Sequence, residues 1–129
     1  MTFVDTNYFL RYLIDDGSPQ HTMAVEFFER GSKSKKLLAT SVLVFFEIFW
    51  TITSFYQKSD LETIEIMKRL LKMAFVKFEQ KEILESALER ASKGIISLED
   101  CFNLEWSIVK KIKDIAKRKP KSTIFCMFI

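Results

Sequence analysis

The sequence has few of the residues that form turns, with three glycines and two prolines among 129 residues. This scarcity argues against a turn-rich β-sandwich or barrel and favours helices joined by short connections. Histidine occurs once, and the two cysteines, Cys101 and Cys126, lack the spacing of a zinc site or a CxxC motif. We therefore expect two free, buried thiols in a reducing compartment and no disulfide framework.

The sequence also lacks a long uncharged apolar run. The longest apolar run, residues 42–56, is too short to cross a bilayer and contains Glu47. The first apolar run contains Asp5 and Arg11, which argues against a signal peptide. These absences predict a cytoplasmic protein without a membrane-spanning segment.

Apolar residues make up 48% of the chain, and 13 phenylalanines provide ample area for one core. The length predicts a single domain over residues 1–129. Short apolar runs of strand length alternate with helical patterns, which predicts layered α/β architecture with a mostly parallel sheet. Strands are expected over residues 2–4, 36–40, 75–78 and 123–129, and helices over residues 6–14, 18–31, 42–57, 59–73, 80–92 and 97–115.

Glu47 is the most informative single residue, because it is the only charged side chain between Leu37 and Gln57. A helix this apolar is expected to be largely buried, and an isolated buried carboxylate is costly. Glu47 is therefore either a protonated or distantly paired core residue, or else a metal ligand or catalytic carboxylate.

Two further acids occupy places where function and structure compete as explanations. Asp5 follows the first strand, at the edge of the sheet where sites gather in parallel α/β folds, but it could also be a helix N-cap. Asp100 lies three residues after Ser97, so it could simply belong to the first turn of a capped helix.

Positive charge is concentrated near the C-terminus, where residues 106–122 hold seven cations and one anion in a chain of net charge +3. Such a segment can contact phosphates, although a solvated helix end is the commoner role. The candidate contacts to an RNA backbone are Lys110, Lys111, Lys113, Lys117 and Arg118.

Three segments share a pattern with one family of nucleases. The run FVDTNYFLRYLIDD (residues 3–16) contains Asp5, TSVLVFFEIFW (40–50) contains Glu47, and ISLEDCF (96–102) contains Asp100. In order and spacing these motifs resemble those of PIN-domain nucleases, most closely the VapC-type toxins of bacterial and archaeal toxin–antitoxin pairs. The resemblance covers roughly residues 1–118.

The resemblance implies a three-layer α/β/α, Rossmann-like fold around a short parallel sheet of four strands. It also implies that Asp5, Glu47 and Asp100 converge to hold Mg²⁺ or Mn²⁺ and cut RNA with metal-activated water. Thr6 and Asn7 would orient that water or the phosphate through hydrogen bonds. The resemblance further implies a homodimer that binds a cognate antitoxin.

Electrostatics support a metal at this place independently. Carboxylates brought within about 4 Å repel by roughly 4 kcal/mol per pair at an effective dielectric constant of 20, and a divalent cation removes this repulsion. The pattern departs from the family at its end, where Cys126 stands in place of a fourth acid and the terminus is expected to be truncated or altered. A thiolate matches Mg²⁺ poorly, so we expect one tightly held metal and slow cleavage. The alternatives are an inactive PIN-like protein that acts through partner binding, or a housekeeping RNA-processing nuclease.

Overall fold

The structure is a computed structural model that describes residues 1–112. The chain divides into two compact units, Met1–Glu79 and a second unit that begins at Gln80. The prediction of a single domain over residues 1–129 stays a prediction. Within residues 1–112, none of the helices combines the length and the apolar character that a membrane span requires.

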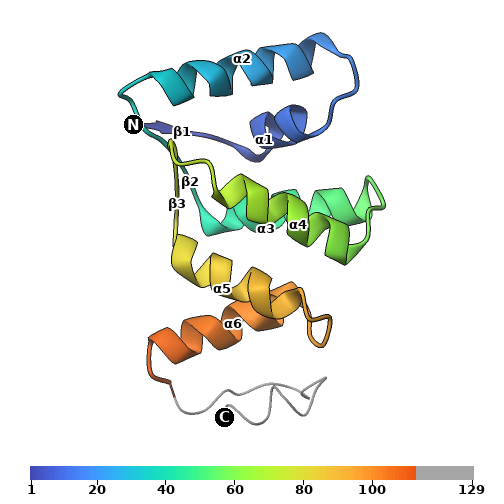
Figure 1. The fold of residues 1–129 in the computed structure, drawn as a ribbon, viewed down its shortest axis with the longest axis vertical. Helices are drawn as coiled ribbons and strands as arrows, with labels where there is room; N and C mark the ends of the chain where they lie inside the picture. Colours follow the sequence, from blue (N-terminus) through green and yellow to red (C-terminus); the bar gives the residue numbers. More distant parts are fainter. Residues whose placement is uncertain (113–129) are drawn as a thin grey trace. The chain divides into compact units, whose positions relative to one another are not determined.

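The first unit alternates strands and helices as the sequence predicts (Figure 1). Its elements are β1 (Thr2–Phe3), α1 (Thr6–Leu13), α2 (Pro19–Lys33), β2 (Leu38–Thr40), α3 (Val42–Ser54), α4 (Asp60–Leu71) and β3 (Val76–Phe78). The predicted α/β class is confirmed, with most element boundaries falling within a few residues of the predicted ones.

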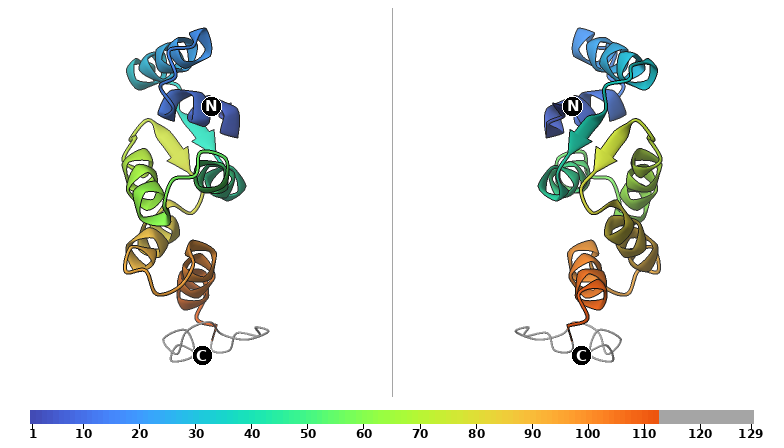
Figure 2. Two further views of the ribbon diagram at one scale, coloured as in Figure 1. Left: turned by 90° about the vertical axis from the view of Figure 1, so that its right-hand side faces the viewer. Right: turned by 90° about the vertical axis from the view of Figure 1, so that its left-hand side faces the viewer.

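The sheet has the order β1-β2-β3, and both strand pairs are parallel. Thr2 lies opposite Leu38, which in turn lies opposite Val76. Figure 2 shows β2 and β3 with α1 and α2 on one side and α3 and α4 on the other. The described residues form three strands and not the expected four, and the run expected to form the fourth, residues 123–129, lies outside them.

Serine caps set where three helices of this unit begin. The side-chain oxygens of Ser18, Ser41 and Ser59 accept backbone N–H groups three residues later, at 3.2, 3.2 and 3.1 Å. Each bond satisfies one of the N–H groups that the first turn of a helix leaves without an internal partner. Each of these helices therefore begins at the residue after its serine.

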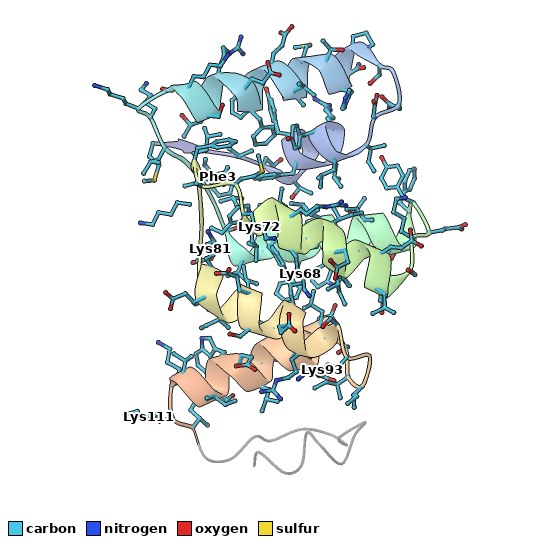
Figure 3. The ribbon with its side chains drawn as sticks, viewed as in Figure 1. Phe3, Lys68, Lys72, Lys81, Lys93 and Lys111 are labelled. Carbon is cyan, nitrogen blue, oxygen red and sulfur yellow. The ribbon has the colours of Figure 1, made fainter. Side chains whose placement is uncertain are left out.

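Aromatic side chains fill much of the first unit's core. The ring of Phe9 lies 5.2 Å from that of Phe28 and 5.9 Å from that of Phe78, which joins α1, α2 and β3. Phe45 and Ile48 of α3 are fully buried beside them in the core. Phe3 of β1, in contrast, is 60% exposed (Figure 3).

The second unit contains two packed helices, α5 (Lys81–Ala91) and α6 (Leu98–Val109). Arg90 donates from Nε to Oε1 of Glu105 at 2.7 Å, a half-buried ion pair that joins the two helices. The helix α6 ends at Val109, earlier than the sequence predicts, and Lys111 adopts a left-handed conformation with φ of 58°. This backbone conformation cannot continue a right-handed helix.

Cys101 is a buried free thiol, as the sequence predicts. Burial raises the pKa of this thiol to about 11, because the charged thiolate would lose its hydration. Cys126 lies outside the described residues.

Candidate active site

The backbone that carries Asp5 is held firmly at the carboxyl end of β1. The N–H of Val4 donates to the carbonyl oxygen of Ala39 at 2.8 Å, and Oγ1 of Thr40 donates to the carbonyl oxygen of Val4 at 2.8 Å. Val4 and Thr40 are both buried. The residue that follows Val4 therefore has a fixed place at this edge of the sheet.

Asp5 occupies the N-cap position of α1, but its side chain does not act as a cap. No side-chain capping hydrogen bond forms, and the N–H of Tyr8 donates to the backbone carbonyl of Asp5 at 3.2 Å. The side chain is exposed. The helix thus leaves the carboxylate available to a ligand, although an N-cap role was the structural alternative for this residue.

Glu47 meets the residue next to Asp5. Oγ1 of Thr6 donates to Oε2 of Glu47 at 2.9 Å across 41 residues of sequence. Thr6 is buried at 7% exposure, whereas Glu47 is half-buried. The hydrogen bond therefore brings the Glu47 carboxylate to the first turn of α1, directly beside Asp5 in the chain.

Two expectations concern this pair. Glu47 keeps partial exposure, whereas its neighbours Phe46 and Ile48 are buried in the core. The Thr6 hydroxyl donates to Glu47, so it is a positioning group for the carboxylate. Its expected role in orienting water or phosphate stays a prediction.

Asp100 belongs to the second unit, in the first turn of α6. Its backbone N–H donates to Oγ of Ser97 at 3.2 Å, so the capping role expected of Ser97 is confirmed. The Asp100 side chain is half-buried. Its meeting with Asp5 and Glu47 stays a prediction.

The donor chemistry at the start of α1 fits a hard divalent cation. Mg²⁺ binds proteins through one or two carboxylates and keeps several waters, so Asp5 and Glu47 alone provide a suitable donor set. Across residues 1–112, no group of three or more His, Cys, Asp or Glu side chains is gathered as a metal site would require. The pair Asp5 and Glu47 is therefore the candidate donor set within the first unit.

The remaining predicted residues lie at the surface or beyond the described chain. Asn7 is exposed on α1 and lines a pocket of about 350 Å³. Lys110 and Lys111, the latter labelled in Figure 3, are exposed after α6. The Nζ of Lys110 lies 5.8 Å from the centre of the Trp106 ring. Outside the described residues lie Lys113, Lys117 and Arg118.

Thr40 is a residue beside the candidate site that the sequence analysis did not single out. Its hydroxyl fixes the carbonyl just before Asp5, which is a contact between residues 36 positions apart. A threonine at the end of an apolar run is the only local signal, and a buried hydroxyl at a strand end does not by itself identify its acceptor. A larger cavity of about 610 Å³ in the first unit contains none of the predicted site residues.

Comparison with known proteins agrees with these observations. No curated protein matches the chain. The PIN domain family model matches residues 2–118, a range that includes all three candidate acids and extends over both units. PIN domains are generally nucleases and generally use divalent metal ions. The chain therefore belongs to the PIN domain family.

Proposed function

We propose that the protein is a metal-dependent endoribonuclease that hydrolyses RNA with a metal-activated water. The observation that carries this proposal is the arrangement at the start of α1, where Thr6 holds Glu47 at 2.9 Å next to an Asp5 that does not cap its helix. Membership of a family of nucleases supports it.

Each residue of this arrangement has a distinct role. Asp5 and Glu47 would hold the cation with Asp100 as a third ligand, and Thr6 fixes one carboxylate oxygen of Glu47 through its hydrogen bond. Asn7, exposed on the same helix, orients the phosphate. A bound Mg²⁺ or Mn²⁺ supplies a water of lowered pKa and neutralises charge on the phosphate.

A cleavage assay tests this function directly. Single-stranded RNA is incubated with the full chain in Mg²⁺, in Mn²⁺ and in EDTA, and a DNA of the same sequence is run in parallel. We expect RNA products with either ion and none with EDTA. Absence of cleavage with both ions contradicts the proposal, and equal cleavage of DNA contradicts the assignment to RNA.

We further propose that this nuclease is the toxin of a toxin–antitoxin pair and forms a homodimer. Several large apolar side chains of α3, of its connection to α4 and of the first turn of α4 are exposed, which is typical of surfaces that bind protein partners. They are Leu43, Trp50, Phe55 and Leu61. An antitoxin segment with a basic side chain would complement Asp5 and Glu47.

Light scattering tests the partner proposal. The chain alone is expected to have the mass of a dimer, and the product of a neighbouring gene is expected to increase that mass and to inhibit cleavage. A monomer whose mass and activity are unchanged by that product contradicts the toxin assignment, while the nuclease proposal is judged separately by cleavage.

A further inference from the structure

One pocket of the first unit contains a predicted site residue, Asn7. The pocket has a volume of about 350 Å³ and is bounded by α1, by the start of α2 and by Tyr56, which follows α3. Asn7, Leu10 and Arg11 line it from α1, and their spacing places them on one face of this helix. Asn7 therefore connects the pocket to the start of α1, where the candidate acids lie.

The pocket offers a cation and an aromatic ring. Arg11 is exposed, and among the described residues no carboxylate forms an ion pair with it. Tyr56 is 39% exposed, and its ring packs against that of Phe55 with 5.1 Å between the centres. A cation that contacts phosphate and an aromatic ring that stacks on a base are the two elements of single-strand recognition.

The pocket also contains an acid, Asp16. Oδ1 of Asp16 accepts the N–H of Ser18 at 3.0 Å. Hydrogen bonds from Ser18 lower the pKa of Asp16, so the side chain is charged at neutral pH. Because Asp16 repels phosphate, an anion is expected to bind beside Asn7 and Arg11 and away from Asp16.

Helix geometry relates Arg11 to the start of α1. Arg11 lies four residues beyond Asn7 on the same face of α1, which at ~1.5 Å per residue is about 6 Å along the helix axis. We propose that the pocket binds one nucleotide of single-stranded RNA close to the cleaved bond. Arg11 contacts its phosphate, and Tyr56 stacks on its base. This inference rests on the proposed function for the choice of RNA as the ligand.

Binding without cleavage provides the test. The affinity of the full chain for a short single-stranded RNA is measured by fluorescence anisotropy in EDTA, over a range of salt concentrations. Arg11→Gln is expected to weaken binding about tenfold and to lower the slope of log affinity against log salt by about one. Tyr56→Ala is expected to weaken binding about tenfold, whereas Tyr56→Phe retains stacking and binds like the parent.

Arg69→Gln is the matched control. Arg69 is also an exposed arginine of the first unit, but it lines the larger cavity and not this pocket. We expect Arg69→Gln to bind RNA like the parent. Thermal unfolding of each variant verifies that the first unit remains folded. Because Arg11 is exposed, Arg11→Gln is the substitution least expected to disturb the fold.

The outcomes separate this inference from the proposed function. Parent-like binding by both Arg11→Gln and Tyr56→Ala overturns the pocket, even if the parent cleaves RNA. An equal loss of RNA affinity with Arg69→Gln also overturns the pocket, because the loss would then follow from removing any positive charge of the first unit. If the two variants lose affinity as expected but the parent does not cleave RNA with Mg²⁺ or Mn²⁺, the result supports the pocket and overturns the nuclease proposal. A parent that binds no RNA overturns the pocket.

Discussion

The starts of α1 and α6 both carry an acid, but the two helices use their acids differently. At α6, Ser97 accepts the N–H of Asp100 at 3.2 Å, so Asp100 lies in a turn that a serine has already capped. At α1, Asp5 is itself in the capping position, and its carboxylate makes no capping bond. The start of α1 therefore leaves the Asp5 carboxylate available for another contact.

The carboxyl edge of the sheet provides a second comparison between two acids. Glu79 follows β3 as Asp5 follows β1, and Oε1 of Glu79 accepts the N–H of Val42 at 2.9 Å, at the start of α3. Glu79 therefore has a structural role that Asp5 lacks. Two acids at one edge of a parallel sheet thus differ in that the side chain of Glu79 accepts a backbone N–H and that of Asp5 forms no capping bond.

The largest expected effect comes from Glu47→Gln, which keeps the shape of the side chain and removes its charge. Cleavage should fall by about 100-fold or more, because a ligand charge that neutralises the cation is lost. The melting temperature in EDTA should not fall, since repulsion from Asp5 is also removed. Initial rates of RNA cleavage and thermal unfolding measure the two effects.

Glu79→Gln is the matched control for this substitution. Its amide oxygen can still accept the N–H of Val42, so both cleavage and stability should stay close to those of the parent. A similar loss of cleavage in both variants would break the contrast between the two acids at this edge of the sheet.

Thr6→Val should have a tenfold effect on cleavage, because it removes the donor to Glu47 while keeping the buried shape. Loss of a group that orients a metal ligand typically costs 10- to 100-fold in affinity or activity. The Mg²⁺ concentration for half-maximal cleavage should rise, and Thr6→Ser should restore it. An unchanged Mg²⁺ dependence in Thr6→Val would show that the hydroxyl has only a structural role.

The sequence predicted local features of the fold well and contacts between distant residues less well. The caps at Ser18, Ser59 and Ser97 are signalled within four residues, because the bond joins neighbours in the chain. The bond from Thr6 to Glu47 joins residues 41 positions apart, and no pattern near either residue specifies it. The sequence thus singled out candidate acids, whose role as ligands stays a prediction, while the hydrogen-bond partners of these acids depend on tertiary packing.

The helix that carries Glu47 shows the limit of composition as a guide to burial. An almost wholly apolar helix predicts burial on all sides, yet α3 exposes Leu43 and Trp50 as well as part of Glu47. Apolar residues can lie at a surface that binds a partner, and composition alone does not separate such a surface from a core.

Ser97→Ala and Asp5→Ala compare the two helix starts by stability. Ser97→Ala should lower the free energy of unfolding by about 1 kcal/mol, because the N–H of Asp100 loses its acceptor. Asp5→Ala should cost only about 0.3–0.5 kcal/mol, from the favourable position of a negative charge at a helix start. Urea denaturation in EDTA measures both, and equal losses would show that Asp5 acts as a cap after all.

The smallest expected effect comes from Asp16, an acid near a helix start that the fold does use. Its carboxylate accepts the N–H of Ser18 at 3.0 Å, and hydrogen bonds from Ser18 lower its pKa below the ordinary value of 3.8. A carboxylate whose pKa is lower in the folded state stabilises that state above pH 3.8, and this contribution is lost as the pH falls through the lowered pKa. Asp16→Ala should therefore lower the urea midpoint slightly at neutral pH, and the difference from the parent should disappear in strong acid. Because the side chain is fully exposed, the effect should be smaller than that of Ser97→Ala. A difference that persists in strong acid would mean that Asp16 acts through the shape of the turn before α2 and not through its charge.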